Sequence, residues 1–197
     1  KGKWHLNGQV IYRGAKAEGL PMNVRVVNAV FEDGTRPEFD AAANGDTVLI
    51  PAGTCVWTTR VTLPGSKAIT LKGAGIDTTT IVDGVPTEIV LDVETATGSF
   101  KRVTQLTMDA RVIEKSGAGP QILITGSGLN SFRIDHVRIT NLRQRGILVD
   151  GEGQELSGVV DHSVFECPGN HSCKGLSLTG DGPTKSQPFS RALALGT

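Results

Sequence analysis

A short glycine-containing motif recurs along this chain and constrains its fold more than any other feature. The motif has the form apolar-x-apolar-x-Gly-x-Gly, and its four copies begin at Ile69, Ile122, Ile147 and Leu176. The last three starts define a period of roughly 25–30 residues, and the interval before them is close to two such periods. A period of this length is typical of solenoids, in which each repeat packs only against its neighbours.

A second repeat interleaves with the first and indicates β-structure. Residues 133–139 (Arg-Ile-Asp-His-Val-Arg-Ile) match residues 159–165 (Val-Val-Asp-His-Ser-Val-Phe), about one period later. Frequent β-branched residues interrupted by glycine, of which the chain has 25, indicate short strands and tight turns. Because no long helix separates the strand segments, a doubly wound α/β fold is excluded. The sequence therefore predicts an all-β parallel β-helix of about 25 residues per rung, with like residues stacked roughly 4.8 Å apart.

The chain divides into three expected segments. Residues 1–34 are irregular with strand-like stretches, and residues 46–197 carry the rungs of the solenoid. Between them, residues 35–45 predict a short capping helix with a proline at its start and Asn-Gly at its end. After residue 182 no second capping helix is recognisable, although a solenoid needs a cap over its last rung. We therefore expect the native solenoid to continue beyond this sequence and to self-associate through the uncapped C-terminal rung.

Two parts of the sequence carry a resemblance to known proteins. Residues 38–54, followed by residues 68–75, are similar to the opening of certain solenoids in which a short amphipathic helix covers the first rung. Residues 132–137 and 158–163 resemble the Ile-Asp-His strands of the same proteins, the pectate-lyase-like right-handed parallel β-helix superfamily. The resemblance implies a right-handed solenoid. It leaves the activity open, because the superfamily includes lyases, glycoside hydrolases, epimerases, adhesins and phage tailspikes.

Charge balance and hydropathy exclude two classes of partner. The chain has 20 basic and 20 acidic side chains, and the lack of a dominant sign argues against nucleic-acid binding. No apolar run approaches the ~20 residues that a membrane-spanning helix needs. Cys167 and Cys173 flank a Pro-Gly turn and are a candidate disulfide, a bond that persists in exported proteins. We therefore expect a secreted or cell-surface protein.

The second repeat places carboxylates and imidazoles at equivalent positions. Asp135 and Asp161 should stack on neighbouring rungs, and so should His136 and His162. Two adjacent carboxylates either bind a cation, which the resemblance implies to be Ca²⁺, or raise the pKa of one of them. The candidate metal ligands are Asp135, Asp161, Asp150 and Glu152.

The alternative is that each Asp-His pair marks a bend in the chain. Ile134 and Val137 cannot share one face of a strand by simple alternation, which favours a bend between them. In that case each aspartate would accept hydrogen bonds from the backbone of the bend.

The resemblance also implies a chemistry for the basic residues near this repeat. Lyases of the superfamily use Ca²⁺ to bridge to an acidic sugar, and an arginine or lysine removes the proton α to the uronate carboxyl group. The catalytic candidates by neighbourhood are Arg138, Arg143 and Lys174. The candidates for substrate binding are Arg133, Arg145, His136 and His162.

The sequence thus predicts a carbohydrate-active protein that binds an acidic polysaccharide and, if it is an enzyme, cleaves it by β-elimination. The alternative is a non-enzymatic surface, adhesin or fibre-type module, in which the β-helix is a rigid scaffold.

Overall fold

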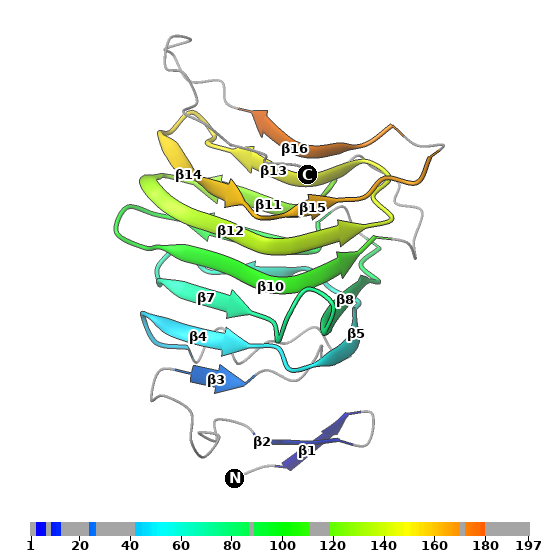
Figure 1. Ribbon diagram of the computed structural model, residues 1–197. Coiled ribbons are helices and arrows are strands. Elements are labelled where there is room, and N and C mark those ends of the chain that lie inside the picture. The colour runs from blue at the N-terminus through cyan, green and yellow to red at the C-terminus, as the bar shows by residue number, and fades with distance from the viewer. Residues whose placement is uncertain are drawn as a thin grey trace.

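In a computed structural model of the chain, β-strands joined by turns and loops stack in successive layers (Figure 1). The structure describes residues 3–6, 9–12, 24–26, 42–86, 89–110, 119–169 and 172–179. These ranges contain no helix, and so none that is long and apolar enough to cross a membrane.

Parallel pairing builds two sheets. The larger sheet has nine strands, with the main order β14-β12-β10-β7-β4-β3, and the smaller sheet has five, in the order β16-β13-β11-β9-β6. The strands of the larger sheet are β3 (Val24–Val26), β4 (Asp46–Leu49), β5 (Gly53–Trp57), β7 (Ile69–Lys72), β8 (Thr79–Asp83), β10 (Lys101–Asp109), β12 (Gly128–Thr140), β14 (Leu156–Asp161) and β15 (Val164–Phe165). The strands of the smaller sheet are β6 (Val61–Leu63), β9 (Leu91–Thr95), β11 (Pro120–Gly126), β13 (Arg145–Asp150) and β16 (Lys174–Thr179). A separate antiparallel pair joins β1 (Lys3–Leu6) to β2 (Gln9–Tyr12), and the parallel layers confirm the predicted β-solenoid.

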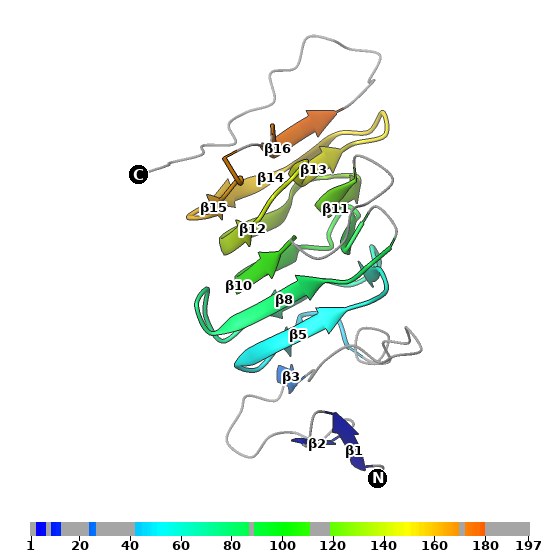
Figure 2. The ribbon, with the colours of Figure 1, turned by 90° about the vertical axis from the view of Figure 1, so that its right-hand side faces the viewer.

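The long strands β10 and β12 each turn a corner at a single residue. The part of β12 before its corner pairs with β14, and the part after it pairs with β15. Gln105 in β10 and His136 in β12 have φ of 58° and 51°, in the left-handed region, which interrupts the alternation of side chains. His162, between β14 and β15, repeats the corner with φ of 45°. The predicted bend at Asp-His is therefore confirmed, and Figure 2 shows the face beyond the corner, where β5 and β8 lie in successive layers.

Apolar side chains pointing inward from both sheets form one continuous core. A register column of the larger sheet consists of Val48, Leu71, Val103, Ile134 and Val160, all buried. Removing a large aliphatic side chain from water contributes roughly 1.5–3 kcal/mol, so stacked columns of this kind hold successive rungs together. Lys101 also takes an inward position, where it is fully buried beside Ile69 and Phe132.

The glycine motif is less regular in space than the sequence predicts. Ile122, Ile147 and Leu176 pair in register on the smaller sheet, as expected. Ile69 instead begins β7 of the larger sheet, and the residue below Ile122 is Leu91. Three of the four copies therefore stack and the fourth does not, because the motif marks a strand followed by a tight turn and such a strand can belong to either sheet.

The rungs differ in length. Thr70 stacks between Thr47 and Arg102 in the larger sheet, and the stretch of chain from Thr47 to Thr70 is shorter than the stretch from Thr70 to Arg102. The stretch from Arg133 to its partner Val159 is intermediate. Since the paired strands keep their register while the intervening loops vary, the single rung length expected from the sequence is not a constant of this solenoid.

Several predictions concern residues that lie wholly or mostly outside the described ranges. The capping helix expected over residues 35–45 lies mostly outside the described residues, and residues 44–45 form a turn. Residues 180–197, on which the uncapped last rung and self-association depend, lie outside them altogether. Of the segment 1–34, only the three short strands are described.

Candidate functional site

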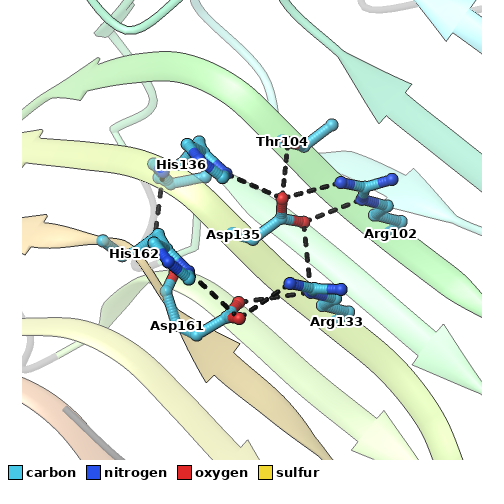
Figure 3. A network of polar contacts seen from close by, with 9 residues as sticks. Arg102, Thr104, Arg133, Asp135, His136, Asp161 and His162 are labelled. Carbon is cyan, nitrogen blue, oxygen red and sulfur yellow. Dashed lines mark hydrogen bonds and ion pairs between the residues drawn. The ribbon is translucent and has the colours of Figure 1, made fainter. Parts of the chain in front are cut away.

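Arginine, aspartate and histidine side chains line the corner of the larger sheet on its outer face. They are Arg102, Arg133, Asp135, Asp161, His136 and His162, which together with Thr104 we call the polar ladder. Figure 3 shows the two carboxylates between the guanidinium groups on one side and the imidazole rings on the other. Arg102 pairs in register with Arg133, and Asp135 with Asp161, so the predicted stacking of the repeat is confirmed.

Asp135 is the centre of the polar ladder. It faces outward, yet it is fully buried because neighbouring side chains cover it. Arg102 binds it with two hydrogen bonds, from Nε to Oδ1 at 2.8 Å and from Nη2 to Oδ2 at 2.7 Å. The hydroxyl of Thr104 donates to Oδ2 at 3.1 Å, and Nδ1 of His136 lies 2.9 Å from the same oxygen. These partners are side chains, whereas the bend hypothesis expected backbone groups.

The surroundings of Asp135 keep it ionised. Burial by itself would raise the pKa of Asp135, but hydrogen bonds from Arg102, His136 and Thr104 outweigh burial and hold that pKa well below its ordinary range. The same hydrogen bonding to Asp135 raises the pKa of Arg102. The expectation that crowding raises the pKa of one carboxylate is therefore wrong for Asp135, because a guanidinium group compensates its charge.

Arg133 extends the ladder to the next rung. Its Nε and Nη2 donate to Asp161 at 3.2 and 2.7 Å, and Nε also lies 3.7 Å from Oδ1 of Asp135. Hydrogen bonding to Asp161 raises the pKa of Arg133. The result is a row of alternating charge, Arg102–Asp135–Arg133–Asp161, with no net charge. A guanidinium group has five N–H donors, so each arginine keeps donors for a ligand.

The two histidines stack face to face beside this row. Their ring centroids are 5.0 Å apart and the planes differ by 4°. Nδ1 of His136 is 2.9 Å from Asp135, and Nδ1 of His162 is 3.2 Å from Asp161, which assigns the ring proton to Nδ1. In the part of the chain that the structure describes, Nε2 of either ring has no protein partner. The side chains are 49% and 64% exposed, so both rings reach solvent.

Four of the predicted basic residues lie apart from the polar ladder: Arg138, Arg143 and Lys174 of the catalytic set, and Arg145 of the substrate-binding set. Arg138 follows the corner of β12 and pairs with Asp77 at 2.8 Å and with Glu166 at 3.3 Å. The others lie at or just before the first residues of β13 and β16, in the smaller sheet: Arg143, Arg145 and Lys174. Arg145 and Lys174 are neighbours in register. The structure therefore brings Arg133, His136 and His162 together with the aspartates, and places the remaining candidates elsewhere.

The predicted acidic cluster is divided between the two sheets. Asp150 ends β13 of the smaller sheet, where its Oδ1 accepts a hydrogen bond from the backbone N–H of Glu152 at 3.1 Å. Asp135 and Asp161 belong to the larger sheet and are bound by arginines. Within the described ranges, no group of three or more His, Cys, Asp or Glu side chains is arranged to hold a metal ion. Ca²⁺ binding stays a prediction.

Two members of the polar ladder were not predicted, Arg102 and Thr104. The signal for them is weak: Arg-Val-Thr at residues 102–104 stacks on Arg-Ile-Asp at residues 133–135, with threonine in place of aspartate. Gln105 likewise takes the place of His136 at the corner. Without the aspartate and histidine, this segment does not stand out as a third copy of the repeat.

The cysteines are arranged as follows. Cys167 and Cys173, the predicted disulfide pair, are joined, with their Cα atoms 6.2 Å apart. Cys55 is a free thiol that packs against the core. Burial raises the pKa of Cys55 to about 11, although a hydrogen bond with Trp57 opposes this rise.

No protein-family model, no curated protein and no solved structure matches this chain.

Proposed function

We propose that this chain is a carbohydrate-active, right-handed β-helix protein of the pectate-lyase-like kind, which binds an acidic polysaccharide along the outer face of β10, β12 and β14. The observation that carries this proposal is the polar ladder, in which hydrogen-bonding side chains of the same kinds recur on consecutive rungs at an accessible face. Adjacent strands lie about 4.8 Å apart, so the ladder offers its donors at regular spacing to a ligand that is itself a repeating chain.

The chemistry of the ladder suits sugar carboxylates and hydroxyls. The free N–H groups of Arg102 and Arg133 favour a carboxylate, which guanidinium groups bind through paired hydrogen bonds. Arg145 and Lys174 add positive charge on the smaller sheet, where they lie side by side and, among the described residues, without an acidic partner. Like charges on adjacent strands repel, and an anionic ligand relieves that repulsion.

Cleavage of the same polysaccharide by β-elimination is a second candidate function, and the Asp-His pairs favour it. In this reaction a base takes the proton α to the uronate carboxyl group, and the electron pair forms a double bond as the leaving sugar oxygen departs. An imidazole whose Nδ1 is held by a carboxylate presents Nε2 as such a base. Lys174 offers an amine for the same step from the predicted set, and Ca²⁺ would neutralise the uronate carboxylate.

The competing proposal is a non-enzymatic adhesin or fibre-type scaffold. It is favoured by the saturation of Asp135, whose oxygens are engaged by Arg102, Thr104 and His136. In that case the polar ladder joins rungs and takes no part in binding. The Cys167–Cys173 disulfide supports a secreted or cell-surface location under either proposal, since disulfides persist in oxidising compartments.

Affinity electrophoresis of the full chain in gels that contain polygalacturonate, alginate or a neutral glucan, with Ca²⁺ or with a chelator, tests the proposal. Retardation by the acidic polymers alone is the expected result. In parallel assays, absorbance from unsaturated uronates identifies a lyase, and new reducing ends without unsaturation identify a hydrolase. Equal mobility in all gels overturns polysaccharide binding and leaves the scaffold.

A matched pair of variants ties the binding to the polar ladder. Arg133→Gln should weaken retardation at least tenfold, whereas Arg60→Gln should leave it unchanged. Arg60 is a suitable control because it is similarly exposed, at 46% against 40%, and also pairs with an aspartate, Asp92, but beside the smaller sheet. Equal effects of the two substitutions would place the binding surface elsewhere.

A further inference from the structure

We infer that Phe100 is a stacking platform for a sugar ring, next to the guanidinium group of Arg102. The inference rests on the proposed polysaccharide binding and deepens it, because it adds an apolar contact to the donors of the polar ladder. The unit that Phe100 and Arg102 bind together is an acidic pyranose, with C–H groups on one face of its ring and a carboxylate at its edge.

The backbone places Phe100 on the same face of the larger sheet as the polar ladder. Its carbonyl oxygen accepts a hydrogen bond from the backbone N–H of Ile69 at 3.1 Å. Further along β10, the carbonyl oxygen of Thr104 accepts the corresponding bond from Gly73 at 2.9 Å. The parallel pairing with β7 therefore includes the residue just before β10. Because side chains alternate along an extended strand, Phe100 shares its face with Arg102 and Thr104.

The side chain of Phe100 is accessible on this face. It is 43% exposed, although a large apolar side chain loses free energy by staying in water. Continuing the register of β10 by one residue places Ala68 on the rung below Phe100 and Ser131 on the rung above. Both neighbours are small, so they leave much of the aromatic ring uncovered. An apolar surface that covers the ring is therefore favoured.

The position of Arg102 next to Phe100 defines the class of ligand. Residues two apart on a strand are separated by about 6.6 Å, so a ring stacked on Phe100 points its edge toward Arg102. Arg102 uses Nε and Nη2 to bind Asp135, and its remaining N–H groups are donors for a carboxylate. An acidic pyranose satisfies both residues at once, whereas a polyanion without rings uses only the arginine.

Affinity electrophoresis of the full chain in gels with increasing polygalacturonate tests the inference. Phe100→Leu keeps an apolar side chain but removes the flat ring, and should weaken the affinity about fivefold. Phe100→Tyr keeps the ring and should bind within about twofold of the parent. Val56→Ala is the matched control and should bind as the parent does, because Val56 is similarly exposed, at 49%, but lies on β5 beyond the corner.

A second polymer separates stacking from charge. Polyglutamate carries carboxylates but no sugar rings, so the parent and Phe100→Leu should have equal mobility in gels that contain it. A loss of affinity for polyglutamate as large as that for polygalacturonate would show that the substitution disturbs the arginines, and would overturn the stacking.

Equal affinity of the parent and Phe100→Leu for polygalacturonate also overturns the inference. If Arg133→Gln still weakens binding in that case, polysaccharide binding by the polar ladder survives. A parent chain that no acidic polymer retards overturns both. If Phe100→Leu fails to fold by circular dichroism, NMR of the parent decides. Nuclear Overhauser effects should then connect the ring protons of Phe100 to C–H protons of a galacturonate oligosaccharide, and their absence at saturation contradicts the inference.

Discussion

Asp135 is a buried charge whose energetic effect depends on its partners. A carboxylate removed from water is costly unless it is paired and fully hydrogen-bonded, and Arg102 and Thr104 meet both conditions here. Breaking such a pair from one side leaves the other charge without compensation, which is why the loss exceeds the net contribution of the pair itself.

Asp135→Asn should therefore lower the free energy of unfolding by about 2–4 kcal/mol, because an amide cannot accept both hydrogen bonds of Arg102 and carries no charge. Urea denaturation measures this loss. Asp77→Asn is the control, since Asp77 also pairs with an arginine but is 81% exposed, and it should change stability by less than about 1 kcal/mol. Equal losses in the two variants would contradict the assigned role of Asp135.

Lys101 is the other unusual residue, an ammonium group in the core. Its Nζ donates to the hydroxyl of Ser99 at 2.8 Å, to the carbonyl oxygen of Lys67, and to that of Gly65 at 3.5 Å. Burial lowers the pKa of Lys101 to about 8, and the charge of Glu94 opposes this only in part. The folded chain therefore loses this proton at a lower pH than the unfolded chain does.

This difference predicts an alkaline rise in stability. Between about pH 8 and the ordinary lysine pKa of 10.5, the unfolded chain binds a proton that the folded chain has released, so the free energy of unfolding rises with pH. The rise should be on the order of 2–3 kcal/mol. Lys101→Met should lack it, and subtracting the two urea-denaturation series from pH 7.5 to 10 isolates it from other titrating groups. Parallel curves would show that Lys101 titrates normally.

At the scale of elements, the corner of the larger sheet is a column of residues in successive rungs. Gln105, His136 and His162 all have positive φ, a conformation that costs an L-residue about 1–2 kcal/mol. Gly73 precedes them in the column, and a Cβ there would overlap the carbonyl oxygen of Gln105. The corner is thus set by backbone conformation, and the histidines take their outward direction from it.

Substitutions at Gln105 measure the strain of this corner. Gln105→Val should lower the free energy of unfolding by about 1–2 kcal/mol, because a β-branched side chain is strongly disfavoured at positive φ. Gln105→Gly relieves the strain and loses chain entropy, so its stability should stay within about 1 kcal/mol of the parent. Thermal or urea denaturation compares them. A valine variant as stable as the glycine variant would argue against a left-handed corner.

Some of these features can be predicted from sequence because a local motif determines them. Others cannot, because they depend on the lengths of loops. The stacking of Asp135 on Asp161 could be predicted because both aspartates occupy the same position in two copies of one short motif. The pairing of Asp135 with Arg102 could not, since it depends on the length of the loop that sets the offset between β10 and β12. For the same reason, the sheet to which Ile69 belongs follows from loop lengths that the local pattern does not contain.

At the scale of the whole molecule, the described parallel layers form a linear array, in which each layer is stabilised mainly by the layers on either side. The strands β10 and β12 have partners on both sides, whereas β16 pairs within the described residues only with β13. Consistent with this, the inward-facing Leu178 of β16 is 43% exposed while Ile124 and Val149 below it are buried.

Amide hydrogen exchange should therefore vary along the solenoid. The slowest exchange is expected in β10 and β12, and faster exchange in β16, because local opening costs less where fewer layers are disrupted. Mass spectrometry of peptides from the full chain measures the gradient. Uniform exchange rates in these three strands would indicate a single cooperative unit and contradict nearest-neighbour stabilisation.

The register between β12 and β14 has a consequence for how the gene can change by duplication. Asp135 sits on Asp161 after one full turn of the chain, and the strands that carry them keep the same side-chain directions. A tandem, in-frame duplication of the codons for one such turn would insert another arginine, aspartate and histidine into the row. Later turns would move along the axis by one strand spacing, and their amino-acid sequence would not have to change. The length of this surface can thus change in whole units through copy number, while the individual contacts stay as they are.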